Sequence, residues 1–155
     1  MMEMPKVTEA HQKLARFAGR WTGREKLSPS PWDPKGGTAV GQCDNRIVTD
    51  GFALVQDYEQ ERNGTVGFRG HGVFSFSARE NCYWLHWWDS MGMGGSVFKG
   101  NFEGDTLQLT CPLPQGFSRG TWEIVNGTHY RFLMEVSGDG QQWMPMIEGD
   151  YARVT

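Results

Sequence analysis

RGHGVFSFSARENCYWLHWWDSMGM, at residues 69–93, predicts two β-strands joined by a short turn. Both strands are rich in aromatic residues, and three of the seven tryptophans of the chain lie here. A strand of an antiparallel sheet normally turns one face to a core and the other to water. Because both faces carry large apolar side chains, one must line a packed interior or a cavity, and the other must be covered. The stretch therefore predicts an all-β fold, a β-barrel with a ligand-shaped interior.

The rest of the chain continues this pattern of short strands and turns. Pairs such as Asp50-Gly51 and Asn63-Gly64 favour tight hairpin turns, which make neighbouring strands antiparallel. Strands are predicted at residues 21–28, 38–49, 52–61, 65–77, 82–88, 96–103, 106–112, 117–125, 128–137 and 143–154. Because a long meander must hide its edges, we predict an antiparallel up-and-down β-barrel of about ten strands over residues 20–154. The whole chain, residues 1–155, is predicted to be one domain.

One short helix is predicted before the barrel, at residues 8–18. Ala10, Leu14 and Phe17 recur at helical spacing, and Thr8 is a suitable N-cap residue. The helix has a single apolar face, so we expect it to pack across the barrel.

Composition and charge exclude several classes of partner. The net charge is −3 and no basic stripe is present, so neither nucleic acid nor an anionic membrane is an expected partner. No segment has the roughly 20 apolar residues that a bilayer span needs, and the first residues do not resemble a signal peptide. Cys43, Cys82 and Cys111 are odd in number and widely spaced, which argues against disulfides or a zinc site. No metal site is predicted, and a bacterial-type cytoplasm is the expected location.

The two histidines of the aromatic stretch are the sharpest candidates for chemistry. If the intervening turn has an even number of residues, His86 pairs near Val73, and His71 and His86 share a face with Trp84 and Trp88. We predict that these four residues line the interior and bind a ligand. An odd turn would instead separate the histidines. The alternative role is structural, with both rings bonded to backbone or water, since two histidines without a third ligand rarely hold a metal.

Other polar residues in the predicted strands are weaker candidates. Tyr58 and Tyr151 lie inside strands, and because buried hydroxyls need partners we predict both as ligand-binding residues. Asp89 ends the aromatic strand and either faces the barrel mouth or only forms a turn. Glu148 and Asp150 point the same way on the last strand and are interpreted as a solvated face rather than a carboxylate pair.

Gly19-Arg20-Trp21, at the start of the first strand, resembles the G-x-W signature of the calycins, the superfamily of lipocalins and fatty-acid-binding proteins. In those barrels the tryptophan closes one end, and a basic residue of the last strand lies across it. Arg153 matches that basic residue by position. The resemblance therefore implies that Trp21 and Arg153 close the barrel through cation–π packing.

Over nearly its full length the chain resembles an uncharacterised, mostly bacterial family catalogued as domain of unknown function 1579. The matching stretches are HQKLARFAGRWTG, SPSPWDP, DGFALVQDYEQER, GHGVFSF, LHWWDSMG and SGDGQQWMPMIEGDYARV. The resemblance implies a calycin-like barrel and no established activity.

Two calycin relatives sharpen the expectation about ligands. Nitrobindins bind ferric haem through a histidine on the last strand, whereas residues 146–153 here read MIEGDYAR and contain none, so neither haem nor another cofactor is expected. Fatty-acid-binding proteins hold a carboxylate with inward Arg and Tyr near the C-terminus. Tyr151 and Arg153 share a face here, but in a different order.

Three functions are compatible with these patterns. We favour binding of a small apolar or aromatic molecule inside the barrel. A second possibility is a barrel filled by its own side chains that forms a homodimer through its outer apolar face. A third is a small barrel enzyme that uses His71 and His86 as acid–base groups near Asp89.

Overall fold

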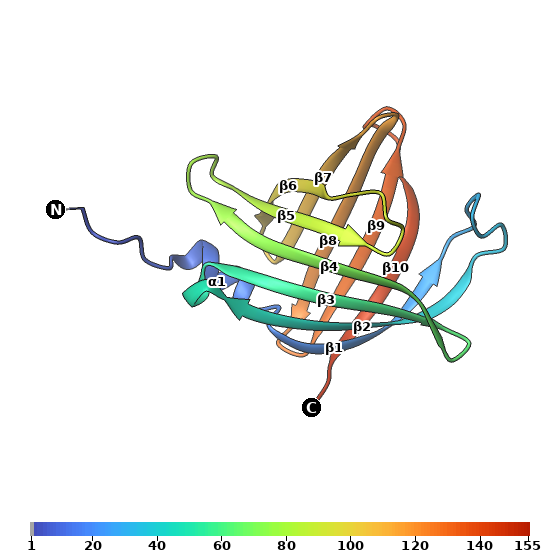
Figure 1. The fold of residues 1–155 in the computed structure, drawn as a ribbon, viewed down its shortest axis with the longest axis horizontal. Coiled ribbons are helices and arrows are strands. Elements are labelled where there is room, and N and C mark those ends of the chain that lie inside the picture. Colours follow the sequence, from blue (N-terminus) through green and yellow to red (C-terminus); the bar gives the residue numbers. More distant parts are fainter. Residues whose placement is uncertain (1) are drawn as a thin grey trace.

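The computed structural model describes residues 2–155 as a closed barrel of ten antiparallel strands with one short α-helix (Figure 1). Each strand pairs with its neighbours in the chain, and β1 completes the ring by pairing with β10. The elements are α1 (Glu9–Ala15), β1 (Gly19–Leu27), β2 (Gly37–Val48), the 3-10 turn η1 (Thr49–Gly51), β3 (Ala53–Arg62), β4 (Thr65–Ser77), β5 (Cys82–Asp89), β6 (Ser96–Glu103), β7 (Thr106–Leu113), β8 (Gly116–Asn126), β9 (His129–Ser137) and β10 (Met144–Arg153). The predicted all-β, ten-stranded antiparallel barrel with one short N-terminal helix is confirmed, and each strand begins and ends within two residues of its predicted bounds.

Two local predictions need correction. The helix α1 is shorter than residues 8–18, because residues 16–18 form tight turns with backbone bonds to the third residue before each. The predicted two-residue turn at Asp50-Gly51 is instead part of η1, in which Thr49 and Asp50 both have positive φ. That longer turn places Phe52 edge-on against the His11 ring, 5.0 Å between ring centroids, and so attaches the turn to α1.

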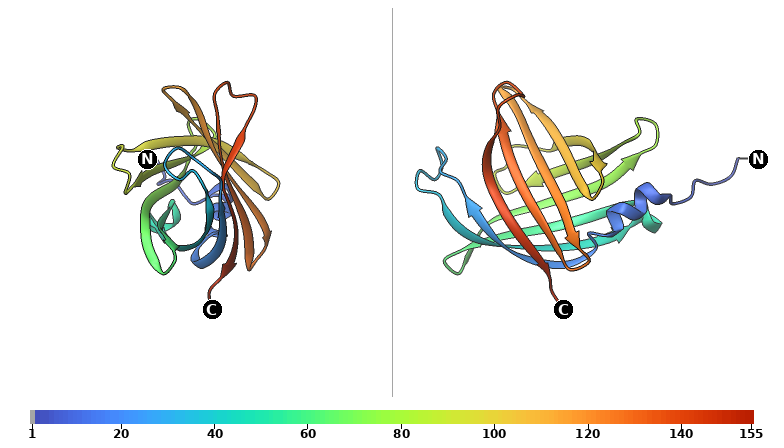
Figure 2. Two further views of the ribbon diagram at one scale, coloured as in Figure 1. Left: turned by 90° about the vertical axis from the view of Figure 1, so that its right-hand side faces the viewer. Right: turned by 180° about the vertical axis from the view of Figure 1, so that it is seen from behind.

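The two ends of the barrel differ. Helix α1 lies across one end, which we call the closed end, where β1 begins and β10 finishes (Figures 1 and 2). The other end, which we call the open end, carries the turns that follow β1, β3, β5, β7 and β9. In Figure 1 strands β1–β4 run across the view and β8–β10 cross them steeply, which shows how strongly the sheet coils as it closes. No helix within residues 2–155 has the length and apolar character to cross a membrane.

The closed end is a packed core. Its buried apolar side chains come from α1 and from the ends of most strands, and they include Leu14, Phe17, Trp21, Leu54, Phe74, Tyr83, Leu107, Leu109 and Ile124. Burying a side chain of this size contributes about 1.5–3 kcal/mol to folding. Helix α1 therefore docks by its apolar face and seals this end.

Trp21 and Arg153 lie together at the closed end, where they are paired across β1 and β10. The Arg153 guanidinium carbon lies 4.2 Å from the centre of the Trp21 ring. Its nitrogens donate to the backbone oxygens of Ala18 at 2.5 Å and Gly127 at 3.1 Å, and the Trp21 indole donates to the oxygen of Phe17 at 2.9 Å. These bonds join the last strand to the turn after α1 and hold the end shut.

Strand pairing decides which faces of β4 and β5 point inward. Ser77 pairs with Cys82 across a turn of even length, so His86 lies opposite Val73 as predicted. The buried positions are on the other face, at Gly70, Gly72, Phe74, Tyr83 and Leu85. The face that carries the histidines is therefore the outer surface of the barrel.

Candidate ligand cavity

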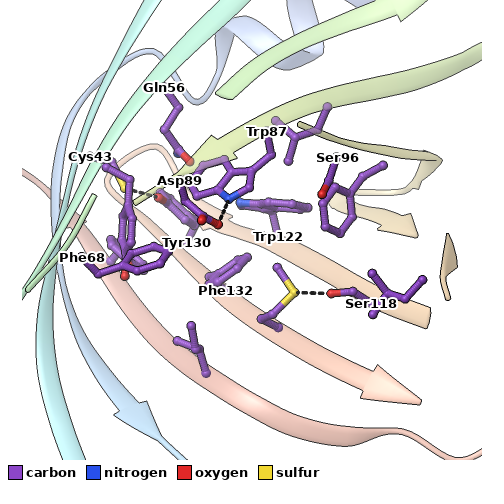
Figure 3. Close-up of a pocket in the computed structure, with 17 residues that line it drawn as sticks. Cys43, Gln56, Phe68, Trp87, Asp89, Ser96, Ser118, Trp122, Tyr130 and Phe132 are labelled. Atoms are coloured by element: carbon purple, nitrogen blue, oxygen red, sulfur yellow. Dashed lines mark hydrogen bonds between the residues drawn. The ribbon is translucent and has the colours of Figure 1, made fainter. Parts of the chain in front are cut away.

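A cavity of about 300 Å³ lies inside the barrel between the closed-end core and the open end (Figure 3). All strands except β1 contribute to its wall. The lining residues are Cys43, Gln56, Tyr58, Phe68, Leu85, Trp87, Asp89, Ser96, Phe98, Leu113, Ser118, Trp122, Tyr130, Phe132, Met134, Ile147 and Tyr151. This volume is at the lower end of the range of small-molecule pockets, and most of the lining is aromatic or aliphatic.

Aromatic side chains form most of the cavity wall. Trp122 and Phe132 pack with ring centroids 5.1 Å apart, and Tyr58 contacts both Phe68 and Trp87 at about 6 Å between centroids. Such large rings fit inside a ten-stranded barrel only where neighbouring positions are small. Gly70 and Gly72 supply that space, because a Cβ atom at either position would collide with the Trp87 ring. The glycines of β4 thus allow Trp87 to lie inside the wall.

A buried carboxylate stands behind two tyrosines of this wall. Glu25 is only 2% exposed and accepts hydrogen bonds from the hydroxyls of Tyr58, at 2.8 and 2.9 Å, and Tyr151. Gln60 Nε2 donates to Glu25 Oε1 at 3.0 Å and to the Tyr58 hydroxyl at 3.0 Å. A buried carboxylate without such donors would be costly. The network therefore positions both tyrosine rings along the cavity.

The tyrosine hydroxyls of this network remain protonated. Burial first, and then the nearby Glu25 carboxylate, raise the pKa of Tyr58 well above its usual value. Burial is also the main reason that the pKa of Tyr151 is raised, with Cys43 and Glu25 adding to it. Both hydroxyls consequently act as permanent donors to Glu25 rather than as acid–base groups.

Cys43 is the only cysteine of the cavity wall within residues 2–155 that could offer a thiolate, and its surroundings oppose ionisation. Burial raises the pKa of its thiol to about 12, although the hydrogen bond from Tyr130, 3.7 Å from Oη to Sγ, partly offsets the effect. The Tyr130 ring stacks on Tyr151 at 5.0 Å between centroids. Since the thiolate is the reactive form, Cys43 is a packing residue and not a nucleophile.

Three polar side chains of the wall can meet a ligand directly. Gln56 is buried in the wall, and no residue within 2–155 makes a hydrogen bond with its amide group. Asp89 accepts bonds from the Trp87 indole at 2.9 Å and from the backbone N–H of Met91 at 3.0 Å, and it keeps further lone pairs free. Ser96, paired with Trp87 at the start of β6, lies near the open end.

The residues predicted to bind a ligand divide into two groups. Tyr58 and Tyr151 line the cavity. His71, Trp84, His86 and Trp88 lie on the outer surface, so the prediction that these four line the interior is wrong. The physical reason is the side-chain alternation of β4 and β5, whose inner positions are taken by the glycines and by Leu85 and Trp87.

On the outer surface these four residues make local contacts. His71 Nδ1 lies 2.6 Å from Asp57 Oδ1, with both side chains half exposed. The Lys99 ammonium lies 4.3 Å above the centre of the Trp84 ring, and Trp88 is 47% exposed. An enzyme with His71 and His86 as cavity acid–base groups therefore lacks the geometry it needs.

Most of the cavity wall is absent from the predicted site residues, Gln56, Trp87 and Trp122 among them. The pattern contains a signal for Trp87, because Gly70 and Gly72 lie on the same face of the hairpin and small residues make room for large ones. Glu148 and Asp150 are exposed on the outside of β10, as their interpretation as a solvated face predicted.

The histidines of the chain lie away from the cavity wall. The four histidines are His11, in α1, His71 and His86, on the outer surface, and His129, exposed at the closed end. None of them lines the cavity. Within residues 2–155, no group of three or more histidine, cysteine, aspartate or glutamate residues is placed to hold a metal ion.

A closed antiparallel barrel with a helix across one end, a Trp–Arg contact at that end and an internal aromatic cavity defines a calycin-like barrel. The chain belongs to the family described as "Protein of unknown function (DUF1579)", whose family model matches residues 6–153. No curated protein sequence matches the chain.

Solved structures share this fold at low sequence identity. Rv2717c from M. tuberculosis is 16% identical, with a TM-score of 0.74 over 97% of this chain and 100% of that one. The S-type phycobiliprotein lyase CPES from Guillardia theta is 9% identical, with a TM-score of 0.63 over 97% and 99%. A mutant of the fluorescent protein UnaG is 14% identical, with a TM-score of 0.56 over 92% and 99%. These likenesses show the fold alone.

Proposed function

We propose that this protein binds a small apolar or aromatic molecule inside its barrel. The observation that carries the proposal is the cavity of about 300 Å³, lined mainly by aromatic side chains, in a barrel whose other half is densely packed. A barrel without a ligand gains dispersion energy by filling its interior with its own side chains. Space retained beside Tyr58, Trp87 and Trp122 therefore supports a role for an added molecule.

Polar groups at the cavity fit the same function. Small-molecule sites combine an apolar lining with a few placed polar groups that fix orientation. Gln56 and Asp89 offer an amide and a carboxylate with bonding capacity to spare. The solved structures that share this fold include a phycobiliprotein lyase and a fluorescent protein. Because one fold serves different functions, the cavity rather than the fold supports the proposal.

We propose further that the protein holds no resident cofactor and is located in the cytoplasm. The donor set of the cavity offers haem no histidine, and the three cysteines are free thiols. We also predict a homodimer, because Trp88 and Val97 leave apolar surface exposed on the outside of β5 and β6.

The first experiment compares native and denatured masses of the protein purified from its own host. We expect an added mass that is lost on denaturation, and the same native spectrum reports whether the protein is a dimer. If the native mass equals that of the chain alone, ligand binding is tested by titrating the neutral dye Nile red into the purified protein and measuring its fluorescence.

A matched pair of variants locates the dye. Ser118→Phe projects a ring into the cavity, where the serine hydroxyl bonds only to Met134 Sδ at 3.2 Å. Ser75→Phe makes the same change on the outer side of β4. We expect Ser118→Phe to abolish dye binding and Ser75→Phe to preserve it. Equal binding by both variants, or no binding by the unmodified protein, would refute the proposal.

A further inference from the structure

The lining of the cavity carries no positive charge. No lysine, arginine or histidine is among the lining residues. Near the open end, Arg62 is paired with Asp33 at 2.5 Å and Arg119 with Glu135 at 2.9 Å. The cavity wall therefore offers a ligand no cationic side chain.

Negative charge is present instead, on two sides of the cavity. Asp89 is part of the lining, and Glu25 stands directly behind the hydroxyls of Tyr58 and Tyr151. The Gln60 amide and the Tyr58 hydroxyl both lie within hydrogen-bond distance of the Glu25 oxygens. Within residues 2–155 no basic side chain forms an ion pair with Glu25, so its charge is solvated by neutral donors and not cancelled.

These charges act in a low-dielectric space. An anionic ligand would lose its hydration without gaining a counter-ion, and it would be repelled by both carboxylates. A neutral ligand avoids that cost. A cationic ligand would be attracted to Asp89 and to the faces of the surrounding aromatic rings, Trp87 above all.

Asp89 is held in place for such a contact. The Trp87 indole and the Met91 N–H each bond one of its oxygens, so the carboxylate is fixed before any ligand arrives. In Figure 3 Asp89 lies against Trp87 and faces the middle of the cavity. Fixed groups lose little freedom on binding, and this increases their contribution to affinity.

We infer that the cavity selects aromatic ligands that are neutral or positively charged, with Asp89 as the anchor for an amino group, and that it rejects carboxylate-bearing ligands such as fatty acid anions. This inference rests on the proposed function and adds a rule of ligand charge to it. It differs from the carboxylate binding that the resemblance to fatty-acid-binding proteins would imply.

The test uses three probes that share one naphthalene ring: 2-naphthylmethylamine, 2-naphthalenemethanol and 2-naphthoate. Near neutral pH they are cationic, neutral and anionic, and calorimetry measures their dissociation constants. We expect the amine to bind tightest. We expect 2-naphthoate to bind at least about tenfold more weakly than the alcohol, because its carboxylate would be desolvated without a cationic partner.

Variants assign the effect to Asp89. Asp89→Asn should reduce the affinity for the amine about tenfold and the affinity for the alcohol by much less, so that the two probes bind about equally. The matched control, Asp44→Asn, removes the same charge from an exposed position on the outside of β2 and should change neither probe. A preference for the amine that survives in Asp89→Asn would overturn the role of Asp89.

The order of the three probes in the unmodified protein decides the charge rule even if Asp89→Asn folds poorly. Naphthoate binding as tightly as the alcohol would overturn the charge rule and leave the proposed function standing. If none of the three probes binds, the proposed function and the charge rule both fail.

Discussion

Removing the hydroxyl of Tyr58 tests the buried network behind the cavity. In Tyr58→Phe the ring stays, but both carboxylate oxygens of Glu25 lose a donor that lies 2.8 and 2.9 Å away. Gln60 also loses the hydroxyl oxygen that it now contacts at 3.0 Å. A hydrogen bond to a charged group contributes about 1.5–3 kcal/mol, so we expect the free energy of unfolding to fall by about 2 kcal/mol. For a chain of this size that loss lowers the Tm by about 4–8 °C.

Tyr83→Phe is the matched control for this variant. It removes the same atom from a hydroxyl that donates to a neutral acceptor, the backbone oxygen of Ala10, at 2.8 Å. Neutral bonds are about half as strong as charge-assisted ones, so the expected loss is about 1 kcal/mol. Urea unfolding followed by tryptophan fluorescence and circular dichroism gives both values. A loss in Tyr58→Phe no larger than the loss in Tyr83→Phe would refute the view that the bonds to Glu25 stabilise the fold more than a neutral hydrogen bond does.

Two further predictions concern space and pH. A Cβ at Gly41 would meet the Tyr151 hydroxyl and the Glu25 carboxylate, whereas a Cβ at Gly67 would meet nothing within 4 Å. Gly41→Ala should therefore lower the free energy of unfolding, measured in urea, by about 1–3 kcal/mol, and Gly67→Ala should lower it by less than about 1 kcal/mol. Equal losses would contradict this account of the cavity wall. The hydrogen bond from His71 is the main cause that lowers the pKa of Asp57 from 3.8. A lowered folded-state pKa stabilises the fold above the unfolded value and loses that effect as the pH falls through the folded value. Asp57→Asn should accordingly give a slightly lower Tm near neutral pH and the parent Tm well below pH 3.8; a deficit that persists in acid would disprove the coupling.

The strands and their order could be predicted because short-range rules govern them. Turn pairs such as Asn63-Gly64 end strands locally, and Asn63 and Gly64 both have the positive φ that such a turn requires. The even turn between β4 and β5 then sets the pairing of Val73 with His86. Closure follows from antiparallel neighbours with no free edge left over, β1 pairing with β10.

The candidate site could be predicted only in part. Tyr58 and Tyr151 are predictable because a hydroxyl inside a strand needs a partner, and Glu25 is that partner for both. Glu25 is not among the predicted residues, although Trp21 is an inward residue and alternation places position 25 on the same face. A charged residue at an inward position was the available signal for a buried polar network.

The amino-acid sequence by itself determined the barrel, the pairing of its strands and the set of side chains that share each face. Only the tertiary structure decided which face is inside. An alternation of period two separates the two faces of a strand but does not tell which of them points inward. Strand β5 is apolar on both faces, with Trp84 and Trp88 on one and Leu85 and Trp87 on the other. The choice depends on volume, because Trp87 fits inside where Gly70 and Gly72 make room for it, and that match exists only once the barrel has closed.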